Sequence, residues 1–242
     1  MTSALVRKLS AFAKLNDAQQ AMLSATCGDV RVLPAKTDLM REGDRPEFLH
    51  LIMEGWAARY KTLPDGSQQI VGFPLPGDFL NAPVTIVGHM DHSVRTVTRC
   101  TMTTVKDDRL QALLSEDRLL EQAFRWSTLV EEATLRSWIV NLGRRDAYER
   151  IAHLFCEIHD RLGLVGLVQS GRFDFPLTQT EIADAVGLTA VHTNRTLQRL
   201  RADKLIETSH KCLTVLDLVA LQKAAGFDPN FLQIDRRVLQ GR

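Results

Sequence analysis

The residues with the clearest chemical purpose lie between Ala190 and Lys204. At about 100° of rotation per residue, a helix here would group four side chains on one side: Val191, Arg195, Gln198 and Ala202. The other side would carry a mostly apolar set: Thr193, Thr196, Leu197, Leu200 and Lys204. A guanidinium group donates two hydrogen bonds to guanine O6 and N7, and a small apolar side chain contacts the methyl group of thymine. The pattern is typical of a helix that packs by one side and places the other in the major groove of DNA.

A shorter helix is expected immediately before that one. Thr178 can cap its first turn, and Glu181, three residues later, completes a capping box. Gly187 permits the left-handed turn that ends this helix, and Thr189 can cap the next one. Because capped helix pairs also occur in ordinary cores, this segment alone leaves open both a DNA-binding unit and a plain helical hairpin.

The residues that follow favour DNA binding. Residues 205–208 and 212–215 have the composition of two strands joined by a turn at residues 209–211. Helix, turn, helix and hairpin in this order make a winged helix, whose tip would bring His210 and Lys211 to a phosphate or a minor-groove edge. A local positive run with one acidic residue inside it precedes the hairpin: Arg199, Arg201, Asp203 and Lys204.

Length and charge limit the class of protein. A chain of 242 residues fits two small domains, and a net charge of +1 means that nucleic-acid binding must come from a local patch. The four cysteines lie far apart and have neither metal-ligand nor disulfide spacing: Cys27, Cys100, Cys156 and Cys212. We find no paired nucleophile and base, no phosphate-binding glycine loop and no metal-ligand spacing, so we expect no enzyme activity and no metal site.

The N-terminal residues and the hydropathy indicate a cytoplasmic protein. The segment MTSALVRKLSAF lacks the apolar core and cleavage site of a signal peptide. No run approaches the ~18 apolar residues that a membrane span requires. We therefore expect a reducing environment and no membrane partner.

Residues 29–105 alternate short apolar runs with turn residues every ~8–12 positions. This spacing predicts an antiparallel β-roll of the jelly-roll kind, and with the helical segments it gives an α+β fold. The expected order is a sensor roll, a long helix with a hinge, a winged helix and a tail: residues 1–116, 117–142, 143–226 and 227–242.

The long helix has no proline or glycine between about residues 117 and 141. Apolar and small residues recur in it at alternating steps of three and four, as in a heptad seam: Ala123, Trp126, Val130, Ala133, Ser137 and Val140. A second stripe is expected to pack on the flanking domains: Leu120, Phe124, Leu135, Trp138 and Leu142. Two apolar stripes favour a homodimer, with one buried helix in a monomer as the alternative. The sequence Asn141-Leu142-Gly143 is expected to interrupt the helix as a hinge.

Several motifs, taken in order, carry a family resemblance. In the roll they are EGD at residues 42–44, EGW at 54–56, the turn PDG at 64–66 and PGDFL at 76–80. In the C-terminal part they are LTQTEIADAVGLT followed by NRTLQRLR. The chain resembles the CRP/FNR family of bacterial transcription regulators over nearly its whole length. The resemblance implies a cyclic-nucleotide-binding-type roll, a dimer helix and a winged helix, acting as a homodimer on palindromic promoter DNA together with RNA polymerase.

The resemblance also assigns residues that would contact DNA. The base-reading positions are Ala190, Val191, Asn194 and Arg195. Those assigned to phosphates are Thr178, Gln179, Thr180, Thr189, His192, Arg199 and Lys211. The cyclic-AMP branch has an arginine-glutamate pair where this chain has Ala190-Val191, so its base preference should differ. Thr193 lies where an aliphatic core residue is expected, and we expect its hydroxyl to bond back to the carbonyl of Thr189 or Ala190.

The residues that would meet an effector depart from the family pattern: Ala82, His92, Ser93 and Arg95. Family members that bind cyclic AMP carry a ribose-binding glutamate near the position of Ala82 and a phosphate-binding arginine near that of His92. Losing such a charge-assisted contact costs about 1.5–3 kcal/mol, which argues against cyclic AMP. Arg95 would share a strand face with Ser93 and is a possible substitute.

Other cofactors of the family are also not expected. Only Cys27 lies in the region where the oxygen-sensing branch clusters its cysteines, so we expect no iron–sulfur cluster. His89 and His92 share a loop-like stretch, for which a solvated loop is expected in preference to a haem site. The leading hypothesis is a dimeric DNA-binding regulator, with an unknown small effector left open. The alternative is a small-molecule or haem sensor whose winged helix contacts protein.

Overall fold

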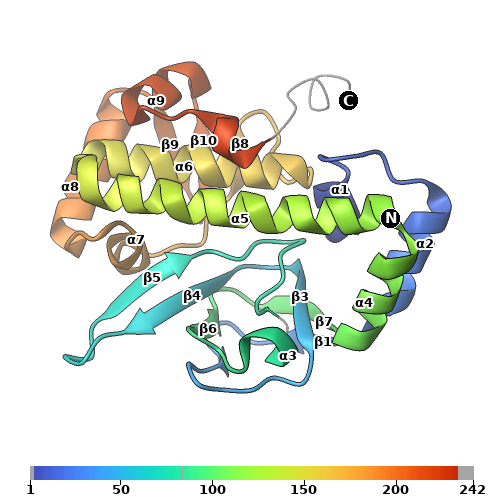
Figure 1. Ribbon diagram of the computed structural model, residues 1–242. Helices are drawn as coiled ribbons and strands as arrows, with labels where there is room; N and C mark the ends of the chain where they lie inside the picture. The colour runs from blue at the N-terminus through green and yellow to red at the C-terminus, as the bar shows by residue number, and fades with distance from the viewer. Residues whose placement is uncertain (1–2, 83, 234–242) are drawn as a thin grey trace. The chain divides into compact units, whose positions relative to one another are not determined.

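The computed structural model of the protein describes residues 3–82 and 84–233 (Figure 1). The chain forms two compact units. Their described parts are residues 3–62, 71–82 and 84–129 for the first, and residues 63–70 and 130–233 for the second. No helix within the described residues is both long enough and apolar enough to cross a lipid bilayer. Helices and antiparallel sheets together confirm the predicted α+β class.

The N-terminal part is an antiparallel β-roll with short helices, as the strand spacing predicted. Its two sheets have the strand orders β1-β7-β3 and β2-β6-β4-β5. The strands are β1 (Cys27–Leu33), β2 (Asp38–Met40), β3 (Leu49–Glu54), β4 (Ala57–Thr62), β5 (Gln68–Gly72), β6 (Ser93–Thr96) and β7 (Cys100–Val105). The helices are α1 (Ala4–Leu9), α2 (Asp17–Thr26), α3 (Val84–Val87) and α4 (Asp107–Glu116).

Alternation along the strands places an apolar core inside the roll. The core includes Met40, Ile52, Ala57, Leu80, Val94, Cys100 and Met102. Ile52 on β3 is paired with Met102 on β7. Gly55 joins β3 to β4 with φ +89°, and a Cβ atom there would lie 2.4 Å from the carbonyl oxygen of Arg99. Only glycine fits this position, which gives the EGW motif a physical reason.

Helix α5 (Arg118–Arg144) is 27 residues long and runs from the first unit into the second. It is continuous through Gly143, so the expected interruption at Asn141-Leu142-Gly143 was wrong. A single glycine inside a helix costs about 1 kcal/mol relative to alanine, which its helical neighbours can offset. The chain turns immediately afterwards, because Asp146 caps the next helix in a capping box with Glu149.

The second unit contains the predicted winged helix. Its elements are α6 (Ala147–Leu164), β8 (Arg172–Asp174), α7 (Gln179–Val186), α8 (Ala190–Ala202), β9 (Ile206–Ser209), β10 (Cys212–Val215), α9 (Leu218–Ala225) and a 3-10 turn (Pro229–Leu232). The small sheet has the order β8-β10-β9. Helix α6 packs against α7, α8 and α9, and buries Ile151, Leu154, Phe155 and Ile158.

The expected C-terminal tail begins inside this packed unit. Phe227 and Leu232 are buried, so the segment directly after α9 belongs to the core of the winged helix. The rest of the expected tail, residues 234–242, lies outside the described residues.

Candidate nucleic-acid interface

The turn between α7 and α8 is built from short-range contacts. The Thr178 hydroxyl accepts a hydrogen bond from the amide of Glu181 at 3.2 Å, and the Glu181 carboxylate accepts one from the amide of Thr178 at 2.9 Å. This capping box confirms the prediction. Gly187 ends α7 with φ 65° and ψ 44°, in the left-handed region. The Thr189 hydroxyl then accepts from the amide of His192 and starts α8.

Helix α8 has one buried side and one exposed side. Thr193, Thr196, Leu197 and Leu200 are buried, while Ala190, Val191, His192, Arg195, Gln198 and Arg199 are exposed and Asn194 is half-buried. The Val191 side chain is 63% exposed, so it is accessible on this side of the helix. The side expected to meet DNA is therefore the side that faces solvent.

Thr193 does not make the expected bond. Its hydroxyl oxygen is buried and has no hydrogen-bond partner among the described residues, so the predicted bond to the carbonyl of Thr189 or Ala190 was wrong. The neighbouring Thr196 makes that kind of contact instead, donating to the carbonyl of His192 at 3.0 Å. The sequence alone does not distinguish the two threonines, because the hydroxyl of any threonine in a helix can bond to the carbonyl one turn earlier.

Two arginines that sequence reasoning missed hold the helices around α8. Arg150 donates to the carbonyl of Val186, at the end of α7, and to the carbonyl of Arg145. Arg145 donates to the carbonyls of Ala225 and Gly226, at the end of α9. Each guanidinium thus caps a helix C-terminus, where the last carbonyls lack partners within the helix. Burial lowers the pKa of Arg145. The sequence signal was the run RRDAYER, but partners up to 81 residues away could not be read from it.

The wing adopts a two-residue turn. Cys212 pairs with Ser209 across β9 and β10, and the loop residues His210 and Lys211 have φ values of 48° and 62°. Positive φ at both positions is the turn whose twist matches a hairpin. Lys211 is exposed at this tip. Away from the wing, at the starts of α7 and α8, four more residues assigned to phosphates are exposed: Thr178, Gln179, Thr180 and Thr189.

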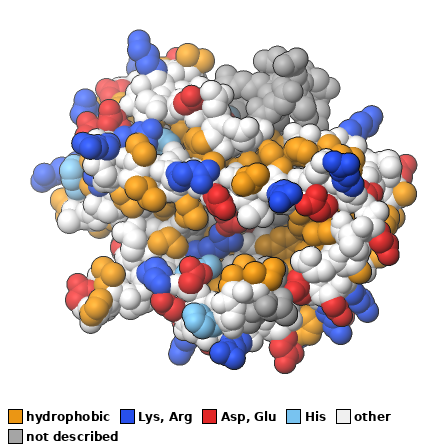
Figure 2. Space-filling view, viewed as in Figure 1, with side chains coloured by type: hydrophobic (Ala, Val, Ile, Leu, Met, Phe, Trp, Pro, Cys, Tyr) orange, Lys and Arg blue, Asp and Glu red, His pale blue; other side chains and the backbone are white. Residues whose placement is uncertain are grey.

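Basic side chains gather on this part of the surface. Figure 2 shows lysine and arginine side chains at the left of the view, where Figure 1 places α8. Arg195, Arg199, Arg201 and Lys204 are all exposed on α8 or directly after it. Arg201 also donates to the Thr208 hydroxyl at 2.9 Å, which ties α8 to the wing. Because the net charge of the chain is near zero, binding to nucleic acid would require a local basic patch, and these residues form one.

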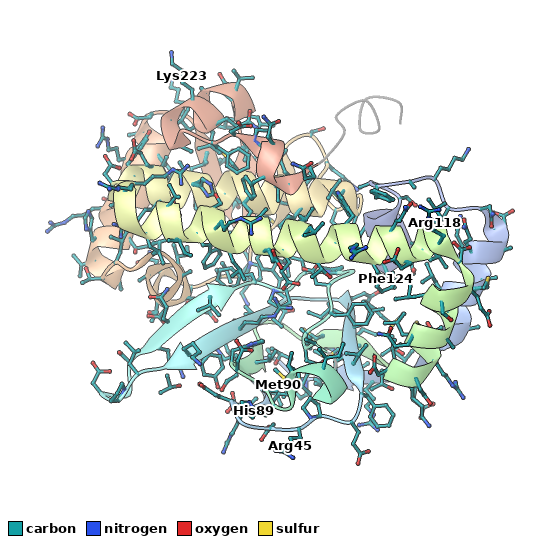
Figure 3. All side chains as sticks on the ribbon, viewed as in Figure 1. Arg45, His89, Met90, Arg118, Phe124 and Lys223 are labelled. Carbon is teal, nitrogen blue, oxygen red and sulfur yellow. The ribbon has the colours of Figure 1, made fainter. Side chains whose placement is uncertain are left out.

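In the roll, the residues expected to meet an effector are engaged elsewhere. The Ser93 hydroxyl accepts from the amide of Glu42 at 3.0 Å. The Arg95 guanidinium lies 4.9 Å from the ring centroid of Tyr60, and Asp91 accepts from the ring of His92 at 2.7 Å. Ala82 is exposed. Arg95 therefore meets an aromatic ring of its own chain. His89 lies at the edge of the roll (Figure 3) and is exposed, as expected for a solvated loop, whereas the His92 side chain is only 16% exposed and does not fit that expectation.

Two further residues that sequence reasoning missed hold the PGDFL segment. Arg59 donates to the carbonyl of Phe79 at 2.6 Å and to that of Leu80 at 3.3 Å. The Asn81 amide oxygen accepts from the amide of His50, and its amide nitrogen donates to a backbone carbonyl. Burial lowers the pKa of His50, although the bond to Asn81 opposes this shift. The backbone where a ribose would bind is thus closed onto the chain's own side chains.

The expected dimer seam needs correction. Ala123 is fully buried in a cluster formed mainly by α1, α2, α4 and α5, and the Ser137 hydroxyl lies 3.0 Å from Nε2 of His153 on α6. Trp126 packs against Phe12, and both Val130 and Ala133 are half-buried, whereas Val140 is 50% exposed. The exposed apolar residues of α5 are Leu129, Leu135, Ile139 and Val140. Small residues favour close packing within a chain as much as between chains. Their spacing alone therefore did not show which residues of α5 face outward.

Comparisons with known proteins agree with this architecture. Residues 30–117 match the family model of the cyclic nucleotide-binding domain, and residues 149–224 match that of the Crp-like helix-turn-helix domain. The transcriptional activatory protein AadR of Rhodopseudomonas palustris is 33% identical over 223 residues, which cover 89% of each chain. The transcriptional activator protein FnrL of Cereibacter sphaeroides is 31% identical over 190 residues, covering 77% of this chain and 76% of that one.

A solved structure shows the same fold. FixK2 from Bradyrhizobium japonicum superposes with a TM-score of 0.70 at 21% identity, covering 83% of this chain and 98% of that one. The matching families and relatives are transcription regulators, and none of these matches indicates a catalytic family. The chain belongs to the CRP/FNR family of transcription regulators.

Proposed function

We propose that the protein is a homodimeric, sequence-specific DNA-binding regulator that places α8 in the major groove. The observation that carries the proposal is the division of α8 into a fully packed side and an exposed side with Arg195 and Val191. Arg195 would read guanine O6 and N7, and Val191 a thymine methyl, with Ala190 and Asn194 beside them. Lys211, Arg199, His192 and the exposed threonines would contact phosphates and set the register.

The experiment that tests this function is a selection of binding sites from random double-stranded DNA, followed by fluorescence anisotropy. We expect a palindromic site with half-sites about one helical turn apart. Affinity should fall steeply between about 50 and 200 mM salt, because cations are released from the phosphates. Binding to a partner protein with no DNA affinity at low salt would instead support the sensor alternative.

The dimer is proposed to use the outer stripe of α5. Leu129, Leu135, Ile139 and Val140 expose apolar surface on one long helix, and a second copy of α5 would cover it. Ile139→Asp should leave an unpaired buried charge at the seam, which costs on the order of 3–5 kcal/mol. Analytical ultracentrifugation should show a dimer for the natural chain and a monomer for this variant. Arg109→Asp, at an exposed position on α4 outside this helix, is the control and should stay dimeric.

We also propose that the protein activates transcription without cyclic AMP. The related proteins AadR and FnrL are transcriptional activators, and we propose RNA polymerase as a partner of this chain because the family resemblance implies it. Ala82 offers a methyl group where a ribose hydroxyl would need an acceptor, and the Ser93 hydroxyl is already bonded to Glu42. In vitro transcription from the selected site should rise on adding protein alone.

A further inference from the structure

Tyr148, near the start of α6, contacts Arg199 of α8 and Asp203, the residue that directly follows this helix. The Arg199 guanidinium carbon lies 4.6 Å from the centroid of the Tyr148 ring. The Tyr148 hydroxyl donates to Oδ2 of Asp203 at 2.6 Å. Arg199 and Asp203 are one helical turn apart, and Nε of Arg199 is 4.0 Å from the same Oδ2 atom. All three residues lie in the second unit.

The distances show which contact Asp203 favours. A bond of 2.6 Å from a hydroxyl to a carboxylate is a strong charge-assisted hydrogen bond. A separation of 4.0 Å between exposed side chains is the outer limit of an ion pair, and such pairs contribute little in water. Tyr148 therefore keeps Asp203 from pairing closely with Arg199.

The ring of Tyr148 acts on Arg199 directly. A guanidinium over the face of an aromatic ring is attracted by the ring quadrupole, which limits the directions that a long side chain samples. The Arg199 side chain nevertheless remains 69% exposed. Burial and the Asp203 carboxylate raise the pKa of Tyr148 to about 12, so its hydroxyl keeps its proton at neutral pH.

We propose that Tyr148 is a positioning residue for DNA binding: its ring holds Arg199, and its hydroxyl holds Asp203 aside, so that Arg199 contacts a DNA phosphate. The inference rests on the proposed function, in which Arg199 is a phosphate contact. It explains how a helix with an acidic residue inside its basic run still presents that run to a polyanion.

The test measures DNA affinity at several salt concentrations for the full-length dimer. Tyr148→Leu removes the ring and the hydroxyl, and should weaken binding about three- to tenfold on specific and random DNA alike. The slope of log affinity against log salt should fall by about one for each subunit, as for Arg199→Ala. Combining the two substitutions should add little, because both remove one contact.

Tyr148→Phe separates the two roles and keeps the core intact. The ring remains, but Asp203 becomes available to Arg199, so we expect a loss of about two- to threefold. Adding Asp203→Asn to Tyr148→Phe should restore the affinity, since an amide carries no charge. Arg201→Ala is the matched control, because Arg201 is held by Thr208 and its effect should not depend on Tyr148.

Specific outcomes would overturn the inference. One is Tyr148→Leu lowering affinity without changing the salt slope, which would indicate a structural role only. Another is failure of Asp203→Asn to restore binding in the Tyr148→Phe background. If the natural protein binds DNA and these results appear, only the role of Tyr148 is lost. If the natural protein binds no DNA even at low salt, the proposed function is lost with it.

Discussion

The outer side of α8 and the PGDFL segment of the roll use their polar groups in opposite ways. On α8, the Thr189 cap and the bond from Thr196 to the carbonyl of His192 hold the backbone, and Arg195 faces solvent. In the roll, Arg59 bonds to the carbonyls of Phe79 and Leu80, and the Ser93 hydroxyl bonds to Glu42. Helix α8 leaves polar side chains exposed and available at the surface, whereas the roll uses its polar side chains in hydrogen bonds within the unit.

The largest expected effect comes from breaking the packed side of α8. Leu200 is fully buried, so Leu200→Ala should lower the free energy of unfolding by about 2–5 kcal/mol through the cavity that it leaves. Urea unfolding followed by circular dichroism measures this. Gln198→Ala, on the exposed side of the same helix, is the matched control and should change stability by less than about 0.5 kcal/mol. Equal losses for both variants would contradict the two-sided description of α8.

A smaller effect is expected in the roll. Arg59→Ala leaves the carbonyls of Phe79 and Leu80 without their donor, which should lower the unfolding free energy by about 1–3 kcal/mol. DNA affinity of the folded dimer should not change, because Arg59 lies in the roll. Chemical denaturation and anisotropy together check both statements. A loss of affinity with unchanged stability would reverse the roles assigned to the two regions.

The caps and turns were predictable from sequence because their partners are close in the chain. The Thr178–Glu181 box, the left-handed Gly187 and the wing turn all depend on residues within four positions. The contacts of Arg145, Arg150 and Arg59 were not predictable, since their partners lie 20 to 81 residues away. The inward contacts of Ala123 and Ser137 were not predictable for a related reason: both have the helical spacing of a seam, but Ala123 is buried in its own chain and Ser137 contacts His153.

A buried histidine gives the second unit a pH dependence that the exposed side of α8 should lack. His153 is 1% exposed, and burial lowers its pKa to about 3, with the charge of Arg145 acting in the same direction. Between about pH 6.5 and 3 the unfolded chain binds more protons at this residue than the folded chain. Its contribution to stability is therefore complete above pH 6.5 and is lost as the pH falls.

The slope from one such group is at most about 1.4 kcal/mol per pH unit. Unfolding free energies at pH 7, 6 and 5 should fall less steeply for His153→Phe than for the natural chain. His192→Ala, at an exposed position on α8, should leave the slope as it is. A slope that is identical in His153→Phe would show that this residue titrates normally.

The smallest effect is expected from cyclic AMP. A ligand at 100 times its Kd adds about 2.7 kcal/mol to the stability of the state that binds it. Because the Ala82 side chain offers no acceptor for a ribose hydroxyl, cyclic AMP at about 1 mM should leave the Tm unchanged in a thermal-shift assay. A clear rise in Tm would show that the roll still opens for a nucleotide.

The most direct test of the proposed recognition is Arg195→Ala on the selected DNA site and on the same site with each base pair changed in turn. We expect the variant to keep the stability of the natural chain and to lose about 1–3 kcal/mol of binding free energy on the intact site. It should also lose its discrimination at one guanine position in each half-site. An equal loss on every sequence, or no loss at all, would contradict the claim that α8 reads bases through Arg195.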